Sequence, residues 1–311
     1  MLTIPTSIPR GWLAFELTVL KRMKFTEVAI PFASDAALGS YLKRWRIGVR
    51  ANDLTMTGWA KAVAAIENSA VTMTDEDVET VLEDAYVPGY KLGNQALRNW
   101  FSETDSWWFD NVRRKIDGLS TPTLRAIAMT IAFGVGDYVL SFDESTRELR
   151  QPLSTVFKRL RTAMPAPFEN GRANTAANRS GYDFIAETFG PDLMFLRLPR
   201  AHNLSQRKYL GWTAWREEWL RGSDEFWDDV EHRQAGRLGT LCETKSQYLR
   251  LVEEMLRTAS HIKNWAIAHT EDGFMTTQEL VETIGEVRKV DTIYTKDFSE
   301  LTGAKAVIVT A

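Results

Sequence analysis

The chain has 311 residues, of which 44% are hydrophobic and 25% charged, a composition typical of one large globular α/β domain or of two domains. The net charge of -3 excludes a protein that coats nucleic acid over its whole surface, although it permits a local basic face. Cys242 is the single cysteine, which excludes an internal disulfide and a multi-cysteine zinc site, and four scattered histidines offer no metal-ligand pair.

The first 25 residues lack the uninterrupted apolar core and the cleavage site of a signal peptide. No stretch of the sequence approaches the roughly 18 consecutive apolar residues of a membrane span. We therefore expect a cytoplasmic protein that does not contact a membrane and holds no metal.

The elements of the first half alternate between strand and helix. Residues 27–30 predict a strand, residues 36–46 a helix, and residues 48–52 a second strand that ends at Asp53. Residues 74–161 have helical periodicity, with distinct runs at 107–116 and 122–139, so we expect a helical insertion there.

The second half returns to strands. Pro, Asn and Gly in residues 163–179 predict a loop. The remaining predicted elements are strands at 192–196 and 263–268, a helix at 279–288, and an antiparallel pair of strands at 292–294 and 306–309. This order suits a mostly parallel, Rossmann-like sheet, but periodicity alone would fit many α/β folds.

Four sequence blocks, the first two of them within residues 30–54, carry a resemblance to a known family. They are IPFASDAALGSYLKRWRIGVRANDL at residues 30–54, DLMFLRLPR at residues 192–200, and a helix, strand and Gly-Phe turn at residues 251–280. In order, they resemble the Dam-like (alpha-group) DNA adenine-N6 methyltransferases. In that family the first strand runs into Asp-Pro-Phe-Ala-Gly-Ser-Gly, the second ends in Asn-Asp, and a later strand ends in Asp-Pro-Pro-Tyr.

The resemblance implies a Rossmann-like fold of the S-adenosylmethionine-dependent methyltransferases with a helical insertion. Residues 1–73 would form the first half of the core and residues 181–311 the second half. Residues 74–180 would form the insertion and the DNA-recognition region.

The cofactor block departs from the family pattern. Ser34 and Ala36 stand where the family has glycines that let the backbone approach S-adenosylmethionine, and Asp35 adds a carboxylate to the same turn. Ile30 stands in place of the family's acidic residue. What remains of the implied cofactor pocket is Phe32, Ala33 and Asp53, although Asp53 is also a typical residue for a turn after a strand.

The catalytic block departs further, because Arg197-Leu198-Pro199-Arg200 stands in place of the family's Asp-Pro-Pro-Tyr. The family's carboxylate accepts a hydrogen bond from the amino group of adenine, and a guanidinium has no acceptor. Arg200 supplies less stacking surface than the family's aromatic ring. We expect no methyl transfer, since losing one preorganised contact of this kind typically costs ~10²–10³ in rate.

Residues 147–208 are basic, with eleven Lys and Arg against five Asp and Glu, which leaves about -9 on the rest of the chain. Arginine and asparagine side chains suit phosphates and base edges, so Asn170, Asn174 and Asn178 are candidates to read adenine. The ordinary alternative is a solvated surface. The candidate DNA-binding residues are Lys158, Arg159, Arg161, Arg172, Arg179 and Arg200.

Trp212, Trp215 and Trp219 recur at helical spacing. Such a stripe could stack on bases, but it more often packs a helix against its neighbours, and we expect packing here. Any exposed part would suit a protein interface.

The leading hypothesis is a catalytically inactive methyltransferase-like protein. It would bind DNA, or a catalytic methyltransferase or nuclease subunit on DNA, in a restriction-modification or phage-defence system, and it would need no cofactor. The alternative is an active adenine-N6 DNA methyltransferase with a divergent site, which would use S-adenosylmethionine. A structural subunit that contacts only protein is the third option.

Overall fold

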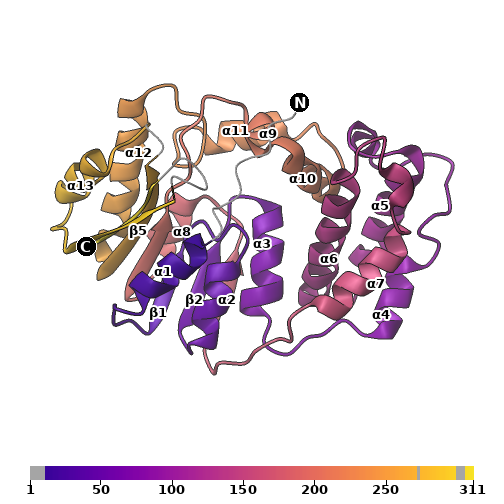
Figure 1. Cartoon of the computed structure of the whole chain (residues 1–311), viewed down its shortest axis with the longest axis horizontal. Helices are drawn as coiled ribbons and strands as arrows, with labels where there is room; N and C mark the ends of the chain where they lie inside the picture. Colours follow the sequence, from indigo (N-terminus) through magenta and orange to yellow (C-terminus); the bar gives the residue numbers. More distant parts are fainter. Residues whose placement is uncertain (1–10, 272–273, 299–304) are drawn as a thin grey trace.

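A computed structural model of the chain describes residues 11–271, 274–298 and 305–311. An α/β core containing a sheet lies beside a lobe made of helices (Figure 1). The two parts share α3 (Met56–Ala62), which contacts both β2 and α6.

Seven strands of the described chain form one sheet, in the order β3-β2-β1-β4-β5-β7-β6. The pairs from β3 through to β5 are parallel, whereas β7 runs antiparallel to both β5 and β6. The strands are β1 (Glu27–Ile30), β2 (Gly48–Asn52), β3 (Thr175–Ala177), β4 (Leu193–Arg197), β5 (Asn264–Glu271), β6 (Thr292–Asp297) and β7 (Lys305–Thr310).

Helices cover both faces of the sheet, and for this reason the central strands are apolar on both faces. On one face α1 (Trp12–Leu20) and α2 (Ala37–Arg44) pack against Val28, Val49 and Phe195. The opposite face of the sheet is covered by α8 (Gly181–Glu187), α12 (Lys245–Thr258) and α13 (Thr277–Gly285).

The helical lobe follows sequence signals closely. Its helices α4, α5 and α6 begin after Thr74, Ser102 and Thr121, whose hydroxyl groups accept backbone N–H groups of the first turn. The consecutive helices of the lobe are α4 (Asp75–Leu82), α5 (Glu103–Asp117), α6 (Pro122–Leu140) and α7 (Leu153–Ala163).

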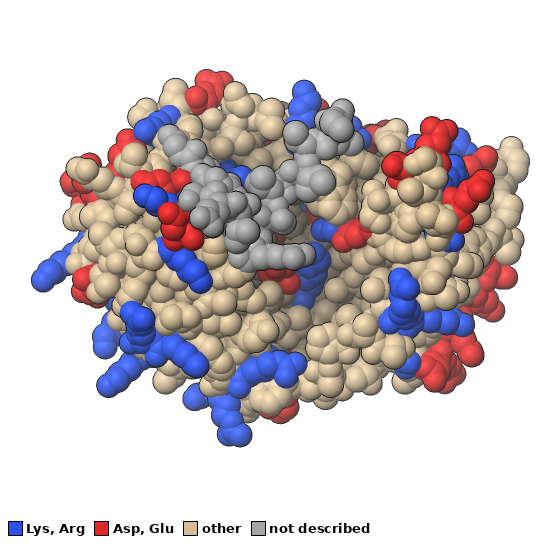
Figure 2. Space-filling view, viewed as in Figure 1, with Lys and Arg blue, Asp and Glu red and all other residues tan. Residues whose placement is uncertain are grey.

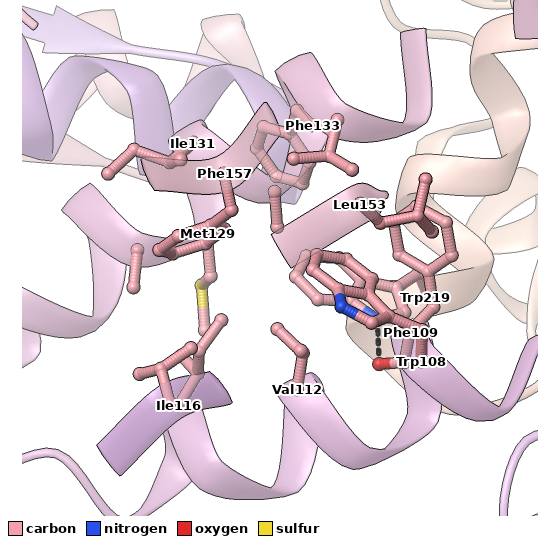
Figure 3. Close-up of a cluster of buried hydrophobic side chains, with 14 of the residues drawn as sticks. Trp108, Phe109, Val112, Ile116, Met129, Ile131, Phe133, Leu153, Phe157 and Trp219 are labelled. Atoms are coloured by element: carbon pink, nitrogen blue, oxygen red, sulfur yellow. Dashed lines mark hydrogen bonds between the residues drawn. The ribbon is translucent and has the colours of Figure 1, made fainter. Parts of the chain in front are cut away.

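Aromatic side chains fill the core of this lobe (Figure 3). Phe109 stacks on Phe101 with ring centroids 4.3 Å apart, and its carbonyl oxygen accepts a hydrogen bond from Trp219 Nε1 at 2.8 Å. Trp215 and Trp219 belong to α10 (Ala214–Arg221) and are fully buried in this core. The prediction that the tryptophan stripe packs is confirmed for these two, while Trp212 is half-buried at the edge of the core.

Shorter elements connect the main ones. These are α9 (Gln206–Leu210), α11 (Trp227–Gln234), a π-helical turn (Val63–Glu67) and 3-10 turns at Gln95–Asn99, Arg147–Leu149, Gly211–Thr213 and Ala259–His261.

The sequence predicted a mostly parallel sheet closed by an antiparallel pair of strands. The structure confirms both features. The loop predicted at residues 163–179 is wrong in part, because β3 lies within it and pairs with β2. The sheet therefore resumes inside residues 74–180, the segment assigned above to the helical insertion.

Among the described helices, α6 alone is long and apolar enough to cross a membrane, which the sequence analysis did not anticipate. Within the protein, 61% of its most apolar segment is buried. Its apolar side chains are accounted for by the core of the helical lobe.

Candidate functional site

A cleft of about 260 Å³ lies at the edge of the sheet where the parallel strands end. Residues that follow β1, β2 and β4 line it, together with Ala268 and Thr270 of β5. In the sheet, β1 lies between β2 and β4, so the strand order reverses direction at β1. Open α/β sheets bind ligands in the crevice at such a reversal, next to the carboxyl ends of the strands.

The turn after β1 has an unusual backbone. Ser34 and Ala36 adopt φ angles of 57° and 63°, in the left-handed region that glycine favours. A side chain in that region costs about 1–2 kcal/mol. The turn thus has a glycine-type geometry without glycine, at the two positions where the sequence comparison placed missing glycines.

Asp53 holds this turn in place. Its Oδ2 accepts a hydrogen bond from the Ser34 backbone N–H at 2.7 Å. Its Oδ1 accepts one from the Thr55 backbone N–H at 2.9 Å and another from Thr55 Oγ1 at 2.7 Å. Burial raises the pKa of Asp53, although these hydrogen bonds oppose that shift. The carboxylate is therefore largely committed to the protein's own backbone.

Arg197 ends β4, and its guanidinium is bound inside the protein. Its Nε and Nη2 donate to the two carboxylate oxygens of Glu16 at 2.9 and 2.8 Å. Glu16 is completely buried and also accepts a hydrogen bond from Trp12 Nε1 at 2.6 Å. Arg197 and Glu16 thus form a bidentate, charge-assisted pair at the base of the cleft.

The rest of the predicted catalytic block is tied to neighbouring elements. The Leu198 backbone N–H donates to the Ala268 carbonyl oxygen at 2.9 Å, and the Pro199 carbonyl oxygen accepts from the Tyr248 hydroxyl at 2.7 Å. Arg200 is exposed at the rim of the cleft. All four predicted positions therefore line the cleft, and so do Phe32 and Asp53. Ala33 is buried in the core beneath it.

The six predicted DNA-binding residues do not form one cluster. Lys158 and Arg159 are exposed on α7, in the helical lobe (Figure 1). Arg161 donates two hydrogen bonds to the Met73 carbonyl oxygen and pairs with Asp75 at 2.8 Å.

The other three members lie on the core. Arg172 is exposed in the loop before β3, at the edge where the strands begin. Arg179 follows β3 at the opposite edge and pairs with Glu187, and Arg200 lies at that same edge.

The three asparagines proposed to read adenine bind the protein itself. Asn170 donates to the carbonyl oxygens of Lys43 and Ile47, and Asn178 donates to that of Asp53. Asn174 accepts the Val49 backbone N–H at 3.0 Å and is buried. These hydrogen bonds hold β3 and its flanking loops against the sheet. Because the side chain of Asn174 is buried, the prediction that Asn174 reads a base is wrong.

The sequence analysis missed Glu16, the partner of Arg197. A signal for it exists, because Glu16 is the single acid in the apolar helix WLAFELTVL, one turn after Trp12. A lone carboxylate in an otherwise apolar helix needs a buried partner. The sequence offers no means of choosing that partner among the 38 Lys and Arg residues.

No group of three His, Cys, Asp or Glu side chains in the described part of the chain lies close enough to hold a metal ion. The chain matches no protein-family model, and no curated protein matches it in sequence.

Proposed function

We propose that this chain is a methyltransferase-like protein that has lost methyl transfer and acts by binding DNA, or by binding a catalytic methyltransferase or nuclease on DNA. The strand order, with its closing antiparallel pair, suits a Rossmann-like sheet of the methyltransferase kind. A restriction-modification or phage-defence system is the setting that the family resemblance suggests.

The observation that carries the loss of catalysis is the buried pair of Arg197 and Glu16. By resemblance, Arg197 stands where an acceptor is needed for the adenine amino group. The guanidinium has no acceptor, and its hydrogen bonds to Glu16 hold it in the protein. Rotating it away would leave the buried Glu16 carboxylate unpaired, at a cost of several kcal/mol.

The residues present do not fit S-adenosylmethionine. Side chains at Ser34 and Ala36 occupy the turn in which the family needs bare backbone. Asp53, the remaining candidate to accept from a ribose hydroxyl, already accepts three hydrogen bonds from the chain itself. We therefore derive no chemical step through this cofactor.

The test of lost catalysis uses the full chain, S-adenosylmethionine carrying a labelled methyl group, and duplex DNA. We expect no heat in a calorimetric titration with S-adenosylmethionine and no label on the DNA. Micromolar affinity, together with labelled DNA whose label disappears in the Asp53→Ala variant, would establish the divergent enzyme instead.

The test of DNA binding uses the same duplex at increasing salt concentration. Phosphate contacts release counterions, so the logarithm of the binding constant should fall linearly with the logarithm of the salt concentration. A subunit that contacts only protein would show no measurable binding to the duplex at low salt, and that result would remove DNA from the proposal.

A further inference from the structure

A second charged surface lies at the edge of the sheet where the parallel strands begin. The turn between α1 and β1 and the turn between α2 and β2 meet there, because the Gly48 backbone N–H donates to the Thr26 carbonyl oxygen at 2.9 Å. Strands of four or five residues separate this edge from the cleft by roughly 13–17 Å. The surface is therefore independent of the cleft.

Six exposed cations occupy this edge, and Figure 2 shows Lys and Arg side chains along the lower left rim, below α1 and α2. We call them the amino-edge patch: Lys21, Arg22, Lys24, Arg44, Arg46 and Arg172.

The described contacts of three patch residues are with aromatic rings. Lys21 lies over Trp45 at 5.8 Å, Arg22 over Tyr294 at 5.4 Å, and Arg44 over Phe168 at 5.8 Å, each measured to the ring centroid. Such contacts orient a cation without neutralising it. Within the described ranges, no carboxylate forms an ion pair with any of the six, whereas Arg161 and Arg179 of the predicted DNA-binding set are paired.

The carboxylates nearest to the patch are mostly engaged elsewhere. Glu27 pairs with Arg50, and Asp192 accepts the backbone N–H groups of Thr26 and Glu27. Glu169 is exposed and accepts the Gly171 backbone N–H at 2.6 Å. The patch therefore keeps a clear positive excess on a protein whose net charge is -3.

The segments that carry the patch are held together. Asn170, two residues before Arg172, donates to the carbonyl oxygens of Lys43 and Ile47 on either side of the α2–β2 turn. The cations consequently project from three segments whose relative positions are fixed by the backbone hydrogen bond between Gly48 and Thr26 and by the side-chain amide of Asn170. A preorganised set of charges loses less conformational entropy on binding than a mobile one.

The backbone conformation of Arg46 is a further, independent observation in favour of a functional surface here. Arg46 sits just beyond the end of α2, with its N–H donating to Lys43 and the next N–H, that of Ile47, donating to Leu42. This pattern is a Schellman motif, in which glycine is the favoured residue because the backbone is left-handed. Arg46 has a φ of 65°, so an arginine is kept in a conformation that disfavours it.

We infer that the amino-edge patch is the principal phosphate-contact surface of this protein and that its partner is the backbone of duplex DNA. The inference rests on the proposed function. Four of the six cations are arginines, whose planar forks match phosphate oxygens. A membrane surface fits less well, because binding to it needs apolar insertion and the turns that carry the patch, all within the described chain, have no exposed large apolar side chain. Tyr41 on α2 and Phe189 before β4 are the exposed aromatic side chains on neighbouring segments.

The experiment measures binding of the full chain to a short fluorescent duplex as a function of salt. One variant carries Lys21→Gln, Arg22→Gln and Lys24→Gln. A second variant removes equal charge from exposed positions on α7 and the turn before it, with Arg147→Gln, Lys158→Gln and Arg159→Gln. Losing three phosphate contacts should weaken binding by about 10- to 100-fold and flatten the salt dependence by about two to three units of slope. The α7 variant tests the rival surface that the sequence analysis favoured. If the amino-edge patch makes the phosphate contacts, the affinity of this variant should change by less than about threefold.

A single substitution at Arg46 separates a loss of DNA contact from a loss of folding. Arg46→Gly should lower affinity about threefold to tenfold, the effect of one phosphate contact, while its unfolding temperature stays the same or rises because the backbone strain is relieved.

The outcomes separate the two proposals. If the unmodified chain binds duplex and the patch variants bind equally well, or only the α7 variant weakens, the inference is overturned and DNA binding stands. If the unmodified chain binds no duplex at low salt, direct DNA binding is removed from the proposed function and the inference is overturned with it. Binding to phosphatidylserine-containing vesicles without binding to duplex would have the same two consequences.

Discussion

The cleft and the core of the helical lobe differ in how well they obey the rules of local structure. In the lobe, hydroxyl groups cap three helices, and aromatic rings pack edge to face on Phe109 and on Trp215. In the cleft, Ser34 and Ala36 hold a backbone made for glycine, and a charged pair fills the base.

Departures from local rules are expected where function, present or past, determines the sequence rather than folding. The core of the lobe follows the rules for helix capping and apolar packing, although Asp84 after α4 also has a left-handed φ of 55°. The cleft combines a glycine-type turn that lacks glycine with a buried ion pair.

The largest effect should come from the Glu16→Gln variant. It keeps the shape of the side chain but removes the charge that balances Arg197, whose side chain is 16% exposed. We expect the free energy of unfolding to fall by about 2–4 kcal/mol, because a largely buried guanidinium is left without a counter-ion. Urea unfolding followed by tryptophan fluorescence would measure it.

The matched control replaces both partners, as Glu16→Leu with Arg197→Met. Removing a buried pair together is often neutral, so most of the lost stability should return. If the double variant is as unstable as Glu16→Gln, the pair is not the source of the effect, and the cleft is less constrained than we argue.

The next effect tests the lobe. A Cβ atom at Gly136 would lie 2.1 Å from the buried ring of Trp215, so Gly136→Ala must displace the aromatic core. We expect a loss of about 1–3 kcal/mol in the free energy of unfolding, even though alanine is the better helix former.

Gly134→Ala, in the same helix, is the control for this variant. Its Cβ would meet only the flexible end of Leu160, at 2.9 Å. It should be neutral or stabilise the protein by up to about 1 kcal/mol through helix propensity. Equal losses in both variants would show that the lobe is not specifically packed around Trp215.

Much of the fold could be predicted from the sequence, because strands such as β4 and β7 are apolar runs and because α4, α5, α6 and α13 begin after a Ser or Thr that caps them. β3 could not, since Thr-Ala-Ala has no periodic signal of its own. It is held by contacts from elsewhere in the chain, including the Glu67 carboxylate, which accepts the Ala176 backbone N–H at 2.9 Å. The same limit explains why α10 could not be assigned to the lobe.

The cleft was predictable in position but not in detail. Ser34, Asp53 and Arg197 each follow a predicted strand, so their meeting at one edge follows from parallel pairing. The pairing of Arg197 with Glu16 spans 181 positions and leaves no local trace in the sequence. The sequence also could not show that Arg161 and Arg179 are neutralised by ion pairs, because their partners Asp75 and Glu187 are brought close only by the fold.

The smallest change in the free energy of unfolding is expected in the turn after β1, and it should be an increase and not a loss. Ser34 is exposed, and its backbone hydrogen bond to Asp53 needs no side chain, so Ser34→Gly removes left-handed strain at little other cost. After the entropy that glycine adds to the unfolded chain, the free energy of unfolding should rise by about 0.5–1 kcal/mol.

The reverse substitution, from glycine to a residue with a side chain, can be made at Gly222. This glycine caps α10 with a φ of 79°, and a Cβ there would meet nothing within 4 Å, so Gly222→Ala adds strain without a clash. A loss of about 1 kcal/mol there would calibrate the gain expected at Ser34. If Ser34→Gly instead destabilises the protein, the turn is adapted to its serine, and the contrast between the cleft and the core of the lobe no longer holds.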